Sequence, residues 1–461
     1  MLKLLVDKCP DTKQGWAKVG AGVVVVGLTV YLAQKWLFPK TEIVQSPTAI
    51  KVTLMAHEQS TMAMVPAVTT ITRFSCNGVS PESFLWSKVA ELLNKNPWLA
   101  GRLKTDEDGL HLSYEPIPPK CSVRQIAAIA TRHFAVIDDM ELPEGLSYDE
   151  LEKKLKHLQV KSGNDCANKD EVLFKVSLIN VKNSNDDVVL VFSISHVLAD
   201  GFTFYQLQNM LDKNTPVTSM EVVRSTRYEM EIQKLKKQPE IMGACALLGM
   251  ISCSLFRSPM RMYIVQLNPT WIEAQKKAFL THHAQRTDGT KDDVTFVSTN
   301  DILTAWHNEI SHTDLALMSI NCRNRVPSFA NKHAGNYENG IMYNTPSDGH
   351  TPEAIRESLK TFRNASNTVP STWKLLQWNT SITTNWCSFY QQIDISDAAT
   401  GSVCKYTTHL PVINSKDLSF FREGMCVFKM DAERIGLFVF TRRLTPDILE
   451  NSGVGRVLNS L

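Results

Sequence analysis

Residues 188–201 read Val-Val-Leu-Val-Phe-Ser-Ile-Ser-His-Val-Leu-Ala-Asp-Gly, and this stretch decides the fold that we expect. The apolar residues before His196 are rich in β-branched and aromatic side chains, which predicts a strand buried on both faces. A more amphipathic segment after Gly201 predicts a helix, and a glycine without Cβ permits the sharp turn between the two. His196 and Asp200 therefore lie at the carboxyl end of a strand, where α/β proteins tend to keep reactive groups.

His-x-x-x-Asp-Gly fixes only three positions, so other interpretations stay open for this segment alone. One is a core histidine satisfied by hydrogen bonds, followed by an aspartate that caps the next helix. Another is a metal site, but no Cys or His pair with ligand spacing lies near His196 and Asp200. The doublet His282-His283 lacks the carboxylate of a known zinc motif. We therefore expect no metal.

Other segments of the chain support the interpretation of His196 as a reactive group. An amphipathic run from residue 84 continues to Leu-Ala-Gly-Arg-Leu at 99–103. Residues 298–306 read Ser-Thr-Asn-Asp-Ile-Leu-Thr-Ala-Trp, residues 321–325 read Asn-Cys-Arg-Asn-Arg, and Gly-Asn follows at 335–336. In this order, these segments resemble the chloramphenicol-acetyltransferase-like superfamily, and within it the CoA-dependent acyltransferases called BAHD.

One part of the chain departs from that resemblance. Plant BAHD members end with Asp-Phe-Gly-Trp-Gly shortly after a Ser-Trp pair, whereas this chain has Thr384-Asn385-Trp386-Cys387 and then Asp394-Ile395-Ser396-Asp397. The tryptophan and the first aspartate are present, and the Phe-Gly-Trp-Gly part is not. The chain is therefore similar to a divergent relative rather than to a plant enzyme.

The resemblance implies an α/β fold with two pseudo-symmetric domains of mixed sheets and a channel at their interface. We expect a tail and membrane anchor at residues 1–44, a first acyltransferase domain at 45–235, an apolar crossover at 236–261 and a second domain at 262–461. The Asp106–Gly109 and Asn183–Asp186 segments predict hairpin-type turns between apolar runs.

The resemblance also implies the chemistry. His196 is the expected general base, because an imidazole with pKa near 6.5 removes a proton from a hydroxyl or amine at neutral pH. Acyl-CoA is an activated donor, so it serves as co-substrate, with no tightly bound cofactor and no covalent enzyme intermediate. The chain has no Gly-x-Ser-x-Gly nucleophile elbow, which agrees with direct transfer. Trp386, backed by Thr384, is expected to stabilise the oxyanion, and Ser298 and Thr299 to bind the cofactor.

The aspartate of the motif has a different expected role. By resemblance, Asp200 turns away from the base and pairs with Arg323, which braces the loop that also holds Gly201. A guanidinium can hold a carboxylate by two parallel hydrogen bonds. The alternative for Arg323 and Arg325 is an ordinary solvated strand end.

Composition sets bounds on the function. The chain has 461 residues, of which 43% are hydrophobic and 21% charged, as in globular proteins with a large core. A net charge of +2 without a basic block argues against nucleic acid as a partner. Ten cysteines without Cys-x-x-Cys spacing favour a reducing compartment. We expect a monomer.

The N-terminal segment predicts a single membrane span at about residues 16–38. It is apolar from Val19 to Ala33 except for Thr29, with Trp16, Trp36 and Phe38 at its ends. The alternatives are a cleaved signal peptide, for which Ala33-Gln34-Lys35-Trp36 is a poor cleavage site, and a buried core helix. A second apolar run at 241–256 is interpreted either as a buried connecting helix or as a surface helix that dips into the bilayer.

Orientation depends on weaker signals. Four lysines precede the span and three follow it closely, which leans only slightly toward a cytosolic N-terminus and a lumenal catalytic part. Acyl-CoA and unpaired cysteines favour the cytosolic side, so we expect an endoplasmic reticulum protein with a cytosolic catalytic domain. Glycans at the sequons of Asn364 or Asn379 would instead indicate the lumen.

The sequence thus predicts an acyltransferase that moves an acyl group from acyl-CoA to a hydroxyl or amine of a lipophilic acceptor, in specialised or lipid metabolism. A membrane lipid acyltransferase of the wax-ester or diacylglycerol type usually carries His-His-x-x-x-Asp-Gly, and here Ser195 replaces the first histidine. An inactive binding protein of the same fold remains a further alternative, although His196, Asp200 and Gly201 are all present.

Overall fold

The computed structural model describes residues 48–117, 123–143, 145–184, 186–225, 227–236, 260–285, 294–345, 348–363, 379–413 and 422–458. The expected tail and span at 1–44 and the apolar run at 241–256 lie outside these residues. Within these ranges, no helix is both long and apolar enough to cross a bilayer.

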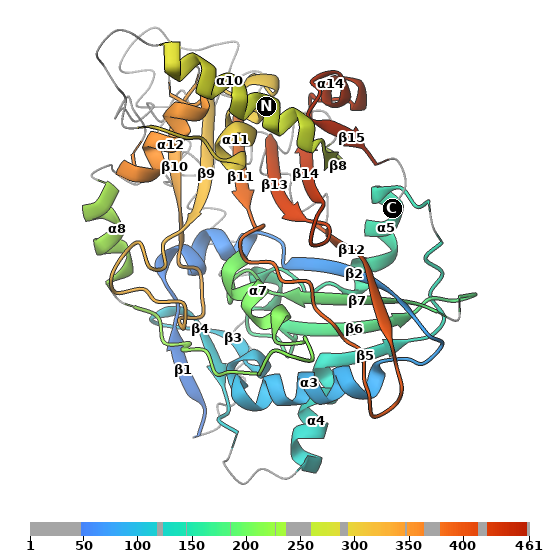
Figure 1. Ribbon diagram of the computed structural model, residues 1–461. Helices are drawn as coiled ribbons and strands as arrows, with labels where there is room; N and C mark the ends of the chain where they lie inside the picture. The colour runs from blue at the N-terminus through green and yellow to red at the C-terminus, as the bar shows by residue number, and fades with distance from the viewer. Residues whose placement is uncertain are drawn as a thin grey trace, which may run out of the picture. The chain divides into compact units, whose positions relative to one another are not determined.

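The first lobe is built on a mixed five-stranded sheet in the order β12-β2-β7-β6-β5 (Figure 1). Neighbouring strands are antiparallel except β6 and β5, which run parallel. Helices α3 and α4 pack against each other and against the β5 edge. The elements are β2 (Val68–Cys76), α3 (Glu82–Lys95), α4 (Val123–His133), β5 (Phe134–Ile137), β6 (Phe174–Asn180), β7 (Asp187–Ile194), α7 (Gly201–Asn209) and β12 (Cys404–Pro411).

The second lobe is built on a mixed seven-stranded sheet in the order β10-β9-β11-β13-β14-β8-β15. Strand β11 runs parallel to both of its neighbours, and the other pairs are antiparallel. The elements are β8 (Arg261–Leu267), α10 (Pro269–Gln285), α11 (Thr299–Ile310), β9 (Leu315–Asn321), β10 (Glu338–Asn344), α12 (Pro352–Thr361), β11 (Thr380–Asn385), β13 (Glu423–Lys429), β14 (Ile435–Thr441), α14 (Pro446–Asn451) and β15 (Gly455–Val457).

A small antiparallel sheet in the order β1-β4-β3 completes the first lobe. Its β3–β4 hairpin turns between Asp106 and Gly109, as the sequence predicts. The other predicted turn joins β6 to β7, although Asn185 within it is outside the described residues. The remaining elements are β1 (Ile50–Thr53), a π-helical turn (Glu58–Met62), β3 (Arg102–Asp106), β4 (Gly109–Tyr114), α5 (Tyr148–Leu155), α6 (Gly163–Cys166) and α8 (Tyr228–Lys236).

One strand of the second half belongs to the sheet of the first. In the chain β12 lies between β11 and β13 of the larger sheet, yet it pairs with β2, from Cys404 opposite Cys76 to Pro411 opposite Thr70. A disulfide joins Cys76 to Cys404 at one end of this pairing. The contiguous second domain expected at 262–461 does not account for this pairing. The sequence could not predict it, because the apolar pattern of a strand does not specify which sheet the strand joins.

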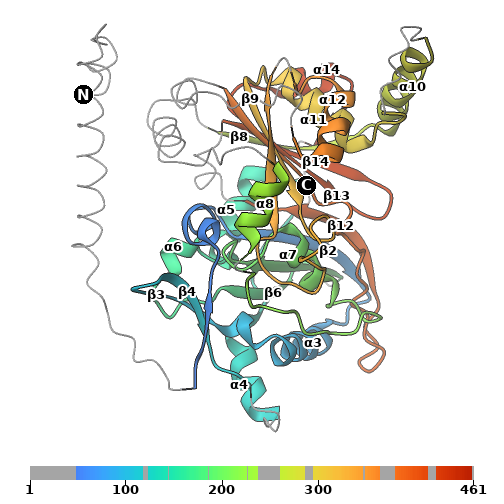
Figure 2. The same ribbon diagram turned by 90° about the vertical axis from the view of Figure 1, so that its left-hand side faces the viewer.

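The two elements around the histidine loop differ in how well the sequence describes them. Strand β7 is buried from Val188 to Ile194, as the apolar run predicts. The helix expected after Gly201 is present as α7. It is not amphipathic, however, because it is buried on almost all sides. Figure 2 shows the reason, since α7 lies where the two lobes meet, and Asn209 Nδ2 at its end donates to the Phe389 carbonyl 2.9 Å away.

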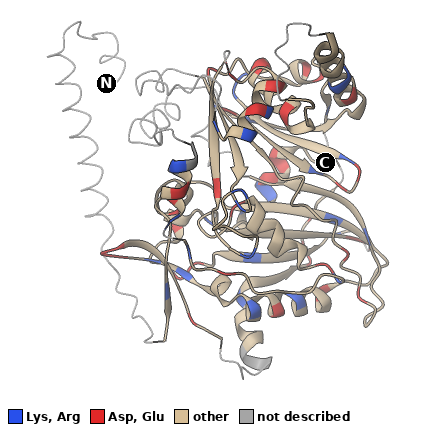
Figure 3. Ribbon diagram, turned by 60° about the vertical axis from the view of Figure 1, so that its left-hand side comes forward, with Lys and Arg blue, Asp and Glu red and all other residues tan. Residues whose placement is uncertain are grey.

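Charged residues lie mostly on the outer elements. Figure 3 shows acidic and basic residues interspersed on the outer helices, α3 among them. Asp200–Arg323 and Glu58–Arg224 are exceptions among the ion pairs of the described residues, because both partners of each are buried. Both lie beside the histidine loop.

Candidate active site

The histidine loop begins where β7 ends. The Ser195 N–H donates to the Leu173 carbonyl at 2.8 Å, and the Leu198 N–H closes a turn onto the Ser195 carbonyl at 2.9 Å. Between them, His196 is part-exposed in a loop whose other residues are buried. Its ring therefore stays accessible while the backbone around it is held by packing and hydrogen bonds.

Asn336 from the second lobe orients the His196 ring. The Asn336 Nδ2 donates to the carbonyls of His196 at 2.7 Å and Val197 at 3.2 Å and to Glu58 Oε1 at 3.1 Å. Because all three partners are acceptors, the amide oxygen faces the ring, 3.1 Å from His196 Nδ1. An amide oxygen only accepts, so Nδ1 carries the proton and Nε2 keeps its lone pair. This is the tautomer that a general base requires.

A buried ion pair holds Asn336 in turn. Glu58 accepts from the Asn336 N–H at 2.9 Å, and Arg224 Nε lies 3.1 and 3.0 Å from the two Glu58 oxygens. Burial alone would raise the pKa of Glu58, but the Arg224 charge, the electrostatic influence of His57 and hydrogen bonds from Arg224 and the Met55 N–H bring that pKa below its ordinary value. Glu58 is therefore an ionised acceptor, which fixes the direction of the Asn336 amide.

The Asp200–Arg323 pair expected from the resemblance is present. Arg323 Nη1 lies 2.6 Å from Asp200 Oδ2, and both side chains are buried. The other Asp200 oxygen accepts from the Thr203 N–H at 2.8 Å, so the same carboxylate also caps α7. The Arg323 guanidinium donates further to the Gly335 carbonyl at 2.9 Å. One ion pair thus ties the end of the histidine loop to α7 and to the residue before Asn336.

The two arginines of the Asn-x-Arg-x-Arg segment have different surroundings. The alternative that both arginines are solvent-exposed residues at a strand end is wrong for Arg323. Its side chain is buried and has ion-pair and carbonyl partners. That alternative describes Arg325, which is exposed and donates only a 3.3 Å bond to the Leu359 carbonyl. Two residues of separation along an irregular segment place them on different sides of the chain.

Trp386 explains why glycine follows Asp200. A Cβ at Gly201 would lie 2.7 Å from Trp386 Nε1 and 2.9 Å from its Cδ1, closer than real Cβ atoms come to other heavy atoms. The indole therefore packs directly on the first turn of α7. This contact places Trp386, from the second half of the chain, at the histidine loop, where the sequence analysis expects it to act.

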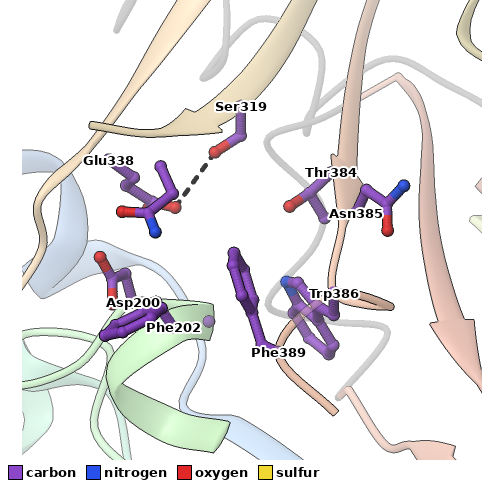
Figure 4. Close-up of a pocket in the computed structure, with 10 residues that line it drawn as sticks. Asp200, Phe202, Ser319, Glu338, Thr384, Asn385, Trp386 and Phe389 are labelled. Atoms are coloured by element: carbon purple, nitrogen blue, oxygen red, sulfur yellow. Dashed lines mark hydrogen bonds between the residues drawn. The ribbon is translucent and has the colours of Figure 1, made fainter. Parts of the chain in front are cut away.

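A pocket opens between the two lobes beside this contact. Figure 4 shows the Thr384 oxygen and the Trp386 nitrogen pointing toward its centre. Among the described residues that line the pocket, neither group has a hydrogen-bond partner (Figure 4). His196 does not line the pocket itself, but Asp200 and Gly201 at the end of its loop do. The complete lining is Asp200, Gly201, Phe202, Ser319, Asn321, Glu338, Thr384, Asn385, Trp386 and Phe389.

Ser298 and Thr299 lie at the start of α11, outside the pocket lining. The Ser298 hydroxyl accepts from the Asp301 N–H and the Asp301 carboxylate accepts from the Ser298 N–H, which forms a capping box. The next residue, Asn300, accepts from Asn385 Nδ2 at 3.0 Å. The first turn of α11 is therefore connected to the Asn385 wall of the pocket, and the cofactor role of Ser298 and Thr299 remains a prediction.

Asn336, Glu58, Arg224 and Glu338 are among the site residues that the sequence did not predict. Asn336 was part of a quoted motif without a role, and Glu58, Arg224 and Glu338 belonged to no motif. Glu58 and Arg224 are 166 residues apart, and only the folded chain brings them together. A polar residue beside a motif glycine was a usable signal for Asn336, whereas nothing local singled out the other three.

The comparisons with known proteins give the fold. No family model matches the chain, and no curated protein matches its sequence. Among solved structures, TRI101 of F. graminearum complexed with coenzyme A and T-2 mycotoxin is similar with TM-score 0.58 and 13% identity, over 88% of this chain and 99% of that one. The trichothecene 15-O-acetyltransferase TRI3 of Fusarium sporotrichioides gives TM-score 0.55 and 11% identity, over 88% and 93%. The first condensation domain of the CDA synthetase gives 0.52 and 10%, over 88% and 94%.

These similarities establish an α/β fold of two mixed-sheet lobes that resembles the chloramphenicol-acetyltransferase-like fold. At identities of 10 to 13% they carry no information on substrate or mechanism. The function must be argued from the site.

Proposed function

We propose that this chain is a CoA-dependent acyltransferase that moves an acyl group from acyl-CoA to a hydroxyl or amine of a lipophilic acceptor. The observation that carries the proposal is the accessible His196 ring, protonated on Nδ1 by virtue of Asn336 and therefore basic at Nε2. The fold supports it, since TRI101 of the same fold has been solved with coenzyme A.

The proposed reaction proceeds in two steps. His196 Nε2 takes the proton of the acceptor hydroxyl while the oxygen attacks the thioester carbonyl. Trp386 Nε1 and the Thr384 hydroxyl, which point into the pocket without a partner in its lining, stabilise the resulting oxyanion. The tetrahedral intermediate then collapses, the carbon–sulfur bond breaks, and the CoA thiolate receives the proton from His196. No covalent bond to the enzyme forms.

The test is release of free CoA thiol from a panel of acyl-CoAs and lipophilic alcohols, with wild type beside His196→Ala. We expect His196→Ala to lower turnover by about 10²- to 10⁴-fold, which is the range for removing a general base. The melting temperature should change little, because the ring is part-exposed. Equal thiol release by both proteins would contradict the role of His196.

We propose in addition that the catalytic part lies on the cytosolic side of the endoplasmic reticulum membrane, where acyl-CoA is supplied. The Cys76–Cys404 bridge acts against this proposal, because disulfides persist mainly in oxidising compartments. Peptide mapping after thiol blocking in intact cells decides between a cytosolic and a lumenal catalytic part. Free Cys76 and Cys404 would support the cytosolic orientation, and an intact bridge would contradict it.

The two glycosylation sequons are not equal reporters of orientation. Asn379 is buried, and its Nδ2 donates to the carbonyls of Ser311 at 2.7 Å and His312 at 3.0 Å, so the folded chain does not present it to solvent. Asn364 lies outside the described residues. A glycan at Asn364 is therefore the useful observation, and it would place the catalytic part in the lumen.

A further inference from the structure

The pocket between the lobes has an apolar part and a polar part. Phe202, Phe389 and Trp386 form the apolar part, which suits the carbon skeleton of a lipophilic molecule. Glu338 and Ser319, from neighbouring strands β10 and β9, form a polar wall across the pocket from Thr384 and Asn385 (Figure 4). A purely hydrocarbon acceptor would offer this wall no hydrogen-bonding group.

Glu338 differs from the other carboxylates around the histidine loop. Asp200 and Glu58 each pair with a buried arginine. Glu338 has no Lys or Arg partner among the described residues, and its recorded side-chain hydrogen bond is from the Ser319 hydroxyl to Oε2 at 3.1 Å. Glu338 is partly exposed and lines the pocket, so its carboxylate is open to a molecule bound there. The second oxygen of Glu338 is therefore available to a ligand.

Glu338 is held firmly in this position. The Tyr228 hydroxyl donates to its backbone carbonyl, and the residue pairs with Asn321 of β9 in the regular register of the sheet. It follows Asn336, which orients the base, by two residues. A group bound to Glu338 would therefore sit at a fixed position relative to His196.

We propose that the acceptor carries a second hydroxyl group, in addition to the one that is acylated, and that this second hydroxyl binds Glu338 beside Ser319. This inference rests on the proposed acyltransferase function and narrows its substrate class from lipophilic alcohols to diols and polyols on an apolar skeleton. A hydroxyl fits because it both donates and accepts. An acceptor that lacks the second hydroxyl would fill the pocket without a hydrogen bond to Glu338, and a lost hydrogen bond of this kind lets a site discriminate between substrates.

Electrostatics agrees with a hydroxyl rather than with a group of fixed charge. Burial raises the pKa of Glu338 above its ordinary value of 4.5, the Asp200 charge adds to this shift, and the hydrogen bond from Ser319 opposes it. A hydroxyl can donate to the ionised carboxylate and accept from the protonated one. It therefore binds Glu338 in either state.

The acceptor, rather than the pantetheine arm of CoA, is the expected source of this hydroxyl. The residues expected to bind the cofactor, Ser298 and Thr299, begin α11, which is joined to the pocket through Asn385. In Figure 4, Asn385 lies on the wall across from Glu338. If CoA enters along α11, the Glu338 wall faces the other substrate.

The experiment compares alcohols with diols of the same skeleton, in linear, terpenoid and steroid series, on the full-length chain. For any skeleton that is acylated, we expect wild type to prefer the diol in kcat/KM by about 10- to 100-fold, as for a hydrogen bond to a charged group. Glu338→Gln should reduce this preference to less than about threefold, with a larger loss for the diol than for the simple alcohol. Ser319→Ala should reduce it partly.

A matched control is Glu423→Gln. Glu423 is a buried carboxylate of the same sheet, bonded to Thr441 and paired in register with Ser381, at the other end of β11 from the pocket. Burial raises its pKa to about 7. The control should retain the diol preference, so any loss specific to Glu338→Gln does not come from removing a carboxylate of this sheet in general.

Three results would overturn the proposal. The first is equal kcat/KM for alcohol and diol in wild type. The second is an equal loss of kcat/KM with both substrates in Glu338→Gln, which would indicate that Glu338 acts on His196. The third is weaker binding of CoA itself by Glu338→Gln. Calorimetric titration of His196→Ala with the same pairs measures the diol preference without turnover. Failure of acyl transfer in wild type would contradict the proposed function, and the titration would still decide whether Glu338 selects a diol.

Discussion

The two buried ion pairs beside His196 hold different parts of the site. Asp200–Arg323 connects the end of the histidine loop to α7 and to the Gly335 carbonyl. Glu58–Arg224 acts one step further away, since it holds the Asn336 amide, which in turn faces His196 Nδ1. One pair therefore fixes where the loop lies, and the other fixes which nitrogen of the ring is basic.

Gly335 is where the two pairs meet. Its φ of +127° lies in a region that favours glycine, and a Cβ there would come within 2.7 Å of the Arg224 guanidinium. Its carbonyl accepts from Arg323. The comparison teaches that position and protonation of the base are set by separate pairs that share one stretch of backbone, so substitutions in the two pairs should have separable effects.

The largest effect is expected for Asp200→Ala. Removing one partner of a buried pair leaves an uncompensated charge and costs about 3 to 5 kcal/mol of stability, and this substitution also removes the cap of α7. Turnover should fall because the loop is no longer held. The free energy of unfolding from urea titration is the measurement.

A double variant sharpens this result. Asp200→Leu with Arg323→Met removes both charges, so its loss of stability should be smaller than that of Asp200→Ala. A double variant that loses at least as much stability as Asp200→Ala would contradict the lone buried charge as the main cause of the loss.

Glu58→Gln should reduce turnover with a smaller loss of stability, about 1 to 3 kcal/mol. The variant keeps an acceptor for Asn336, and Arg224 keeps the carbonyls of Val222, Ala334 and Leu198 as partners. Without a carboxylate, however, the Asn336 amide is less firmly oriented, so a fraction of His196 should adopt the other tautomer. A decrease in kcat of about tenfold with unchanged KM would agree with this reason.

The pH dependence of stability separates this explanation from a general loss of packing. The pKa of Glu58 in the folded chain lies below its ordinary value of 4.5, so the ion pair stabilises the fold above pH 4.5 and loses that effect as the pH falls through the folded pKa. The difference in unfolding free energy between wild type and Glu58→Gln should therefore shrink below about pH 4.5. A constant difference from pH 7 to pH 3 would contradict an ionised Glu58.

The comparison also shows what a single sequence can predict. The buried strand β7 and the amphipathic helix α3 follow local patterns, and the Asp200–Arg323 pair was expected from the family resemblance. Glu58–Arg224 and the β2–β12 pairing join segments that are distant in the chain. Local periodicity specifies elements, whereas partners are chosen by packing between lobes, so these contacts had no signal in the sequence.

The smallest effect is expected for Arg325→Ala, which tests whether burial rather than motif membership decides the role of an arginine. Arg325 shares its segment with Arg323, but it is exposed, with a 3.3 Å bond to the Leu359 carbonyl and the Phe362 ring 5.5 Å away. Surface substitutions usually change stability by less than about 0.5 kcal/mol. Unfolding free energy and kcat should both stay near wild type, and a loss as large as that of Arg323→Ala would mean that the second arginine supports the site in a way that its exposed position does not explain.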